Sequence, residues 1–163
     1  MPKLRLAKTR IGIPTDVRVP MIALLNQQLA DTFDLYSQTK QAHWNLKGAQ
    51  FFQLHLLFDR LAEETEGYAD LIAERATALG GTALGTARMA AAASRIAELP
   101  SDAVEGLSSV DALSDRYAAL SASTRAAIAI ATSHDDPATA DLFTEVSRGL
   151  DTSLWFLESH LQS

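Results

Sequence analysis

The segment HLLFDRLAEETEGYADLIAE, residues 55–74, decides how we interpret the whole chain. It lies within a predicted helix, and four metal-ligating side chains in it are symmetrical about the point between residues 64 and 65: His55, Asp59, Asp70 and Glu74. A straight helix rises about 1.5 Å per residue, so His55 and Asp70 are separated by roughly 22 Å, too far for one metal ion. We therefore predict that these four residues do not meet within one chain.

A two-fold axis removes this difficulty. If the helix packs antiparallel against a second copy of itself, with the axis near residue 64 or 65, His55 lies opposite Glu74 and Asp59 opposite Asp70. The sequence thus predicts two identical ligand sets at the interface of a symmetric dimer.

The rest of the chain is typical of an all-α protein. Apolar residues recur every three or four positions, the period of amphipathic helices. We predict four long helices with these bounds: from Val19 to Asn45, from Ala49 to Gly80, from a cap at Ser108 or Ser109 to Ser133, and from an N-cap at Asp136 onward. An alanine-rich run at 87–93 predicts a short extra helix in the long connection between helices two and three. The expected architecture is a four-helix bundle with one long crossover.

Charge divides the 163-residue chain unevenly. Residues 1–19 carry five basic residues and one acidic residue, a net charge of +4. Because the net charge of the whole chain is −6, the remaining residues carry −10. We predict a flexible basic arm at 1–18 and one domain at 19–163. The absence of cysteine and of any bilayer-spanning apolar stretch leads us to expect a soluble, cytoplasmic protein.

Two histidines flank the predicted turn at Gly48. His43 lies five residues before this glycine and His55 seven after it, so an antiparallel hairpin brings both imidazoles to similar heights. Asp59, one turn beyond His55, faces the same space. Each residue alone is more often an ordinary core histidine or a solvated carboxylate, and only their joint pattern favours a metal site. Such mixed ligation suits Fe(II), with Zn(II) and Mn(II) as competitors.

Several motifs occur in register along the chain. They are KQAHWNLKG at 40–48, FF at 51–52, LH at 54–55, LFD at 57–59, DLIAER at 70–75, LGG at 79–81, DRY at 115–117 and LWFLE at 154–158. Together they resemble the Dps family of mini-ferritins over nearly everything after the arm. This resemblance implies a ferritin-like four-helix bundle that assembles into a hollow homododecamer. It also implies a ferroxidase that oxidises Fe(II), preferentially with hydrogen peroxide over oxygen, stores Fe(III) as ferric oxide and protects DNA and cell from oxidative damage.

The resemblance further assigns residues to roles. A ferroxidase centre takes His43, His55 and Asp59 from one chain and Asp70 and Glu74 from its neighbour. Trp44, beside a ligand histidine, either intercepts a stray oxidising equivalent or packs at the interface. An acidic group at the start of helix four is expected to line an iron-entry pore, with capping as the alternative for its first member: Asp136, Asp141 and Glu145. Lys40 and Arg75 are expected to form ion pairs across the interface.

Non-specific DNA binding is the alternative function. Many members of the family bind DNA, and here the basic residues available for it are Lys3, Arg5, Lys8 and Arg10. One arm binds phosphate weakly, whereas many arms displayed together bind more tightly and with steep salt sensitivity. The sequence is equally consistent with a solvated arm that binds no partner. A nucleoid-compacting protein would be associated with the nucleoid.

Overall fold

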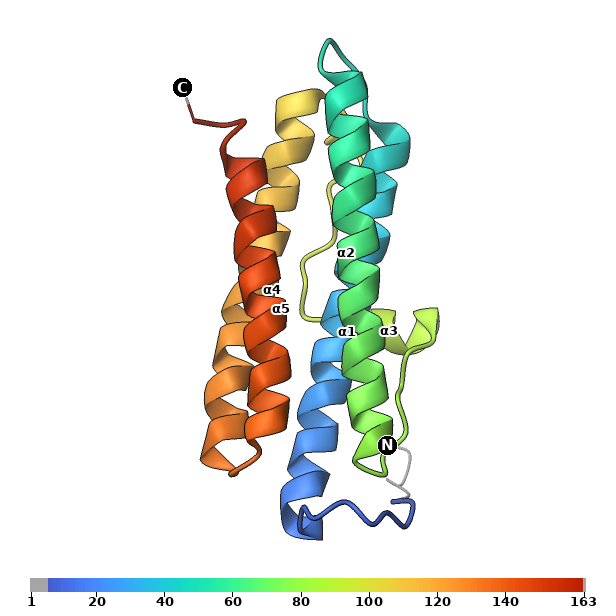
Figure 1. Cartoon of the computed structure of the whole chain (residues 1–163). Coiled ribbons are helices and arrows are strands. Elements are labelled where there is room, and N and C mark those ends of the chain that lie inside the picture. Colours follow the sequence, from blue (N-terminus) through green and yellow to red (C-terminus); the bar gives the residue numbers. More distant parts are fainter. Residues whose placement is uncertain (1–5, 163) are drawn as a thin grey trace.

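The computed structural model describes residues 6–162, and within this range the chain forms five α-helices and no β-strand. Their bounds are α1 Thr15–Asn45, α2 Phe51–Ala78, α3 Ala87–Ala93, α4 Gly106–Ser133 and α5 Pro137–Glu158. The hairpin of α1 and α2 lies alongside the hairpin of α4 and α5, and the short α3 projects from the side of the bundle (Figure 1). The predicted four-helix bundle with an extra helix in its long connection is confirmed. None of the helices described is long and apolar enough to cross a membrane.

Three helix starts differ from the sequence prediction, that of α2 by only two residues, since it begins at Phe51 instead of Ala49. Helix α1 begins at Thr15, four residues before the predicted start, and Pro20 lies inside it. Helix α4 begins at Gly106 with Glu105 as its N-cap, so the predicted caps at Ser108 and Ser109 are wrong. The hydroxyls of these two serines donate to backbone carbonyl oxygens instead of accepting from backbone N–H groups.

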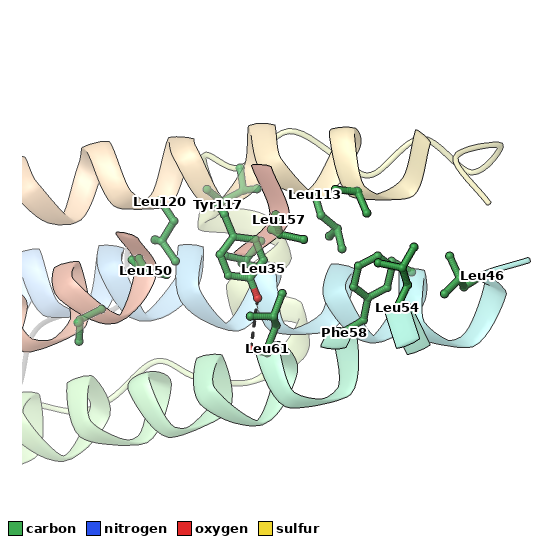
Figure 2. Packing of buried hydrophobic residues seen from close by; sticks show 14 residues of the cluster. Leu35, Leu46, Leu54, Phe58, Leu61, Leu113, Tyr117, Leu120, Leu150 and Leu157 are labelled. Carbon is green, nitrogen blue, oxygen red and sulfur yellow. Dashed lines mark hydrogen bonds between the residues drawn. The ribbon is translucent and has the colours of Figure 1, made fainter. Parts of the chain in front are cut away.

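Two apolar clusters fill the bundle, and Tyr117 lies at the centre of one of them (Figure 2). Its side chain is fully buried. The hydroxyl donates to the carbonyl oxygen of Leu61 at 3.3 Å and lies within hydrogen-bond distance of the hydroxyls of Thr39 and Thr65. Tyr117 thus links α4 to both helices of the other hairpin, where the candidate site is located.

The segment before α1 runs across one end of the bundle. The backbone N–H of Ala7 donates to the carbonyl of Gly80 at 2.8 Å. Leu6 and Ile11 pack against the second apolar cluster, which includes Ile22 and Leu79. Gly80 has a φ of +87°, and a Cβ there would lie 2.8 Å from the carbonyl oxygen of Ala7. Only glycine fits this crossing without strain. The division into an arm at 1–18 and a domain at 19–163 stays a prediction, although α1 already includes the last residues of that arm.

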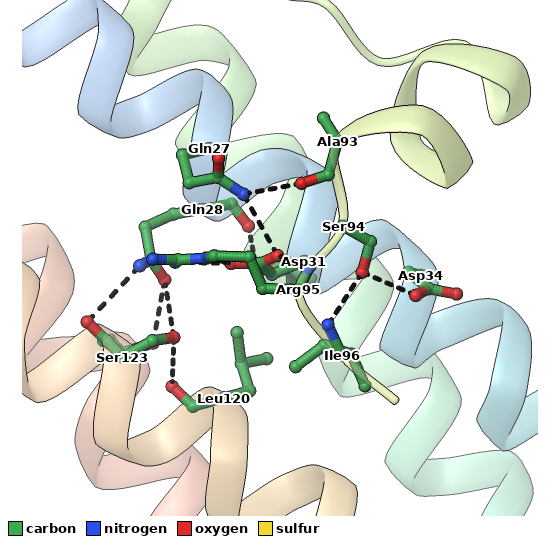
Figure 3. Close-up of polar contacts among 12 residues, drawn as sticks. Gln27, Gln28, Asp31, Asp34, Ala93, Ser94, Arg95, Ile96, Leu120 and Ser123 are labelled. Atoms are coloured by element: carbon green, nitrogen blue, oxygen red, sulfur yellow. Dashed lines mark hydrogen bonds and ion pairs between the residues drawn. The ribbon is translucent and has the colours of Figure 1, made fainter. Parts of the chain in front are cut away.

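A buried carboxylate holds the long connection against α1 (Figure 3). Asp31 is 0% exposed and accepts hydrogen bonds from the backbone N–H and the guanidinium of Arg95, at 2.6 to 3.0 Å. Nearer the start of α1, Asn26 donates to the carbonyl of Thr82 and accepts from the N–H of Leu84. The contacts of Asn26 fix the segment between α2 and α3 as a wall beside α1, and those of Asp31 hold the residues that follow α3.

The buried phenol predicts an alkaline dependence of stability. Burial raises the pKa of Tyr117 from 10.0 to about 12. Because the unfolded chain loses this proton first, the stabilisation is complete below pH 10 and is lost as the pH rises through 12, at about 1.4 kcal/mol per pH unit. We expect the free energy of unfolding of Tyr117→Phe, measured with urea between pH 9 and 12, to lack this contribution to the fall with pH.

The half-buried Tyr36 supplies the control. Tyr36→Phe should keep the alkaline dependence of the wild type, because that substitution leaves the buried phenol in place. An equal slope in wild type and Tyr117→Phe would contradict the assignment.

Candidate metal centre

The α1–α2 hairpin brings His43 and His55 to similar heights, as predicted, and into contact. Their ring centroids are 3.8 Å apart, with the planes inclined by 19°. Nδ1 of His43 lies 2.8 Å from the carbonyl oxygen of His55, and Nδ1 of His55 lies 3.1 Å from that of His43. A tight turn at Gly48, with φ of +106°, makes this reciprocal arrangement possible.

The reciprocal contacts determine the tautomer of both rings. A carbonyl oxygen only accepts hydrogen bonds, so each Nδ1 carries the proton and donates it. In the neutral imidazole the other nitrogen, Nε2, is then left with a lone pair, which is the form that binds a metal ion. Nε2 of His43 lies 3.7 Å from Oδ1 of Asp59. One chain therefore brings two imidazoles and one carboxylate together.

A lysine holds the carboxylate of this group. Nζ of Lys40 donates to Oδ1 of Asp59 at 2.6 Å. This hydrogen bond, together with the positive charge of Lys40, keeps the pKa of Asp59 below its usual value, although partial desolvation opposes the shift. This ion pair is formed within the chain, and the pairing of Lys40 across an interface stays a prediction. Since 43% of the Asp59 side chain is exposed, solvent and incoming cations have access to it.

The remaining predicted ligands lie elsewhere on the surface. Asp70 and Glu74 are exposed on the second half of α2. Within residues 6–162 of a single chain, no three or more histidine, aspartate or glutamate side chains converge closely enough to hold a metal ion. That Asp70 and Glu74 complete the site from a second copy stays a prediction.

Trp44 follows His43 on α1 and is 68% exposed. Nζ of Lys40 lies 6.0 Å from the centre of its ring, at the outer limit of a cation–π contact. The aromatic face therefore borders the candidate centre and is open on the single chain.

One of the pore candidates is a structural residue. Asp136 is 1% exposed, caps α5 by accepting from the N–H of Thr139, and accepts two hydrogen bonds from Arg75 at 2.9 and 3.2 Å. The capping alternative holds for Asp136, whose buried carboxylate is not available to line a pore. Its ion pair with Arg75 is formed within the chain, and the pairing of Arg75 across an interface stays a prediction. Asp141 and Glu145 are exposed on α5 and stay candidates.

Fold and hairpin geometry together define a ferritin-like protein. The ferritin-like domain family matches residues 22–163. The chain is 43% identical over 155 residues to the DNA protection during starvation protein of Agrobacterium fabrum, covering 95% of this chain and 96% of that relative. With this identity over nearly the whole length of both proteins, the chain belongs to the Dps family.

Solved structures agree with this assignment. DpsA14 from Streptomyces coelicolor superposes with a TM-score of 0.92 at 31% identity, covering 98% of this chain and 95% of that one. The Dps protein from Vibrio cholerae O1 superposes with a TM-score of 0.89 at 27% identity, covering 97% and 99%. That protein is described as a member of a broad superfamily of ferritin-like diiron-carboxylate proteins.

The buried cap of α5 yields a prediction about stability. Asp136→Ala removes the N-cap acceptor and leaves the guanidinium of Arg75 without its counter-charge, so we expect a loss of about 3 kcal/mol in urea unfolding. Asp141→Ala, at an exposed position on the same helix, should change stability by less than about 0.5 kcal/mol. Similar small losses in both variants would contradict the structural role of Asp136.

Proposed function

We propose that this protein is a ferroxidase and iron-storage mini-ferritin whose oxidation centre is shared between two chains. One chain supplies His43, His55 and Asp59, and a second copy supplies Asp70 and Glu74. The observation that carries the proposal is the pair of reciprocal histidine-to-backbone hydrogen bonds, which leaves both Nε2 atoms free for a metal ion beside Asp59. The symmetrical spacing of His55, Asp59, Asp70 and Glu74 along α2 supports the contribution of the last two from a second copy.

Fe(II) is the substrate in this proposal, and imidazole and carboxylate donors suit it, with Zn(II) and Mn(II) as competitors. Two Fe(II) ions each give one electron to hydrogen peroxide, the preferred oxidant over oxygen. The O–O bond breaks, two protons are taken up, and two water molecules and two Fe(III) ions result. Because both electrons are delivered together, no hydroxyl radical is released. Fe(III) is then stored as ferric oxide inside a homododecamer, in the cytoplasm.

Lys40 and Trp44 adjust this chemistry from the edge of the site. The ammonium of Lys40 occupies Asp59, so an incoming Fe(II) ion has to displace it before that carboxylate becomes a ligand. Trp44 is close enough to His43 to give up an electron to a stray oxidant, and its exposure also suits packing against a second copy. Asp141 and Glu145 are proposed to line the route by which Fe(II) enters.

Co-assembly of two defective variants tests whether the centre is shared. One variant combines His43→Ala with His55→Ala, and the other combines Asp70→Ala with Glu74→Ala. Each alone should lose Fe(II) oxidation by peroxide. In a random equal mixture half of the dimers are mixed and each has one intact site of two, so about a quarter of the wild-type rate should return. A centre built within one chain would return no activity, which would contradict the proposal.

Direct compaction of DNA is the competing function. In the part of the arm that the structure describes, the chain packs on the end of the bundle, while Lys8 and Arg10 are exposed. Lys3 and Arg5 lie outside the described residues. An arm partly held against an acidic body is poorly placed to reach phosphate, so we propose that DNA is protected chiefly by the removal of Fe(II) and peroxide.

A gel-shift titration distinguishes the two functions. We expect no DNA shift at about 150 mM salt, where surface charges are screened beyond roughly 8 Å. At low salt a weak shift should appear and should vanish when Lys3, Arg5, Lys8 and Arg10 are all replaced by glutamine. A strong shift at physiological salt that depends on these four residues would favour the nucleoid role.

A further inference from the structure

Helix α2 carries a second stripe of residues on the side facing away from the bundle. Its members alternate at spacings of four and three: Phe52, Leu56, Asp59, Glu63, Glu66, Asp70, Ala73 and Thr77. All are exposed or half-exposed, whereas the stripe that includes Leu54, Phe58 and Leu61 is buried against the other helices. Alternation of four and three is the spacing of a helix that packs lengthwise along another helix.

The outward stripe is symmetrical in position and complementary in size. About the point between residues 64 and 65, Leu56 corresponds to Ala73 and Phe52 to Thr77. Leu56 is 53% exposed and Phe52 is 70% exposed, so the large apolar residues of one half are opposite small residues of the other half. Matching of large with small side chains is what close packing of two helices requires.

A hollow beside Ala73 has a largely apolar lining, with Glu66, Asp70 and Thr86 as its polar members. It measures about 440 Å³, and its lining includes Leu29, Phe33, Ala69 and Ala83. The wall formed by the segment between α2 and α3 is held by the hydrogen bonds of Asn26 described above. Asp70, one of the predicted ligands, lies on the rim of the same hollow.

We propose that Leu56 of each copy inserts into the hollow beside Ala73 of the other and sets the register of the two-fold dimer. Leu56 is then a positioning residue, because the register that seats it also brings Asp59 of one copy opposite Asp70 of the other. The proposal rests on the proposed function for the position of the axis.

The charges along the stripe explain why apolar contacts have to provide the attraction. Its centre consists of four carboxylates in each copy, from Asp59 to Asp70, which two antiparallel helices bring together. Like charges at close range oppose association, and Lys40 offsets only one of these carboxylates within the chain. The two ends of the stripe are uncharged, so association depends on burying Leu56 and Phe52.

Disulfide cross-linking tests the contact directly, because the natural chain contains no cysteine. Leu56→Cys combined with Ala73→Cys places the thiols about 25 Å apart along one α2 helix, far beyond disulfide reach, so any bridge joins two chains. We expect full-length protein to form covalent dimers under mild oxidation on a non-reducing gel. Gln53→Cys with Ala73→Cys is the matched control, since Gln53 is exposed on α2 but outside the stripe.

The cross-linking result is decisive in both directions. Dimers from the first pair alone support the proposal, and absence of dimers, or equal yields from both pairs, overturns it. This assay does not involve iron, so its failure in a protein that oxidises Fe(II) would refute the Leu56 contact and leave the proposed function intact. Covalent dimers from a protein that does not oxidise Fe(II) would support the Leu56 contact and refute the proposed function.

A second variant tests the positioning role. Leu56→Ala should weaken association of the dimer about tenfold or more, judged from sedimentation on dilution, and reduce Fe(II) oxidation in parallel. Oxidation should recover at protein concentrations that restore the dimer, which a general loss of folding would not allow. Leu71→Ala, at an exposed leucine of α2 outside the stripe, should leave both measurements unchanged. Equal effects of the two substitutions would overturn the proposal.

Discussion

A straight helix holds its side chains at fixed separations, and this constraint on α2 governs both the fold and the proposed chemistry. The helix runs unbroken from Phe51 to Ala78. Its inner stripe is buried against α1, α4 and α5, which fixes its rotation about its own axis. That rotation in turn fixes which residues point outward, including Asp59 and Asp70. No local adjustment can bring these two carboxylates together within one chain, so completion of the ligand set becomes a question of assembly.

The half of the proposed centre that one chain contains is organised without a metal ion. Both imidazoles are held by backbone carbonyls that belong to the hairpin itself, so neither ring has to rotate or change tautomer. Tyr117 joins this hairpin to α4 from the inside, because its hydroxyl lies within hydrogen-bond distance of a threonine on each helix of the hairpin. In the proposed centre only the Lys40–Asp59 contact has to change when a cation binds, and this pair is exposed enough to exchange readily.

Much of this organisation could be predicted from the sequence because it depends on local rules. Helical periodicity located the long helices, the alanine-rich run at 87–93 located α3, and Asp136-Pro137 correctly marked the start of α5. The starts of α1 and α4 depended on contacts distant in sequence, such as that of Arg18 with the carbonyl of Leu79. The same limit applies to the site. Spacing about Gly48 predicted that the two histidines lie at similar heights, but their ring contact and the capture of Asp59 by Lys40 depend on side-chain rotamers and required the structure.

Division of the centre between chains also bears on the hazard of iron chemistry. A single Fe(II) ion gives peroxide only one electron, which breaks the O–O bond into hydroxide and a hydroxyl radical. An isolated chain with two free imidazoles would risk this reaction if it bound iron well. The ammonium of Lys40 on Asp59 opposes such binding, because a lone cation must displace it with few other ligands to gain. In the proposed dimer, Asp70 and Glu74 add two further negative charges, and the balance then favours Fe(II). On this proposal, the Lys40–Asp59 pair disfavours iron binding by a single chain and leaves it to the assembled protein, where electrons can be delivered in pairs.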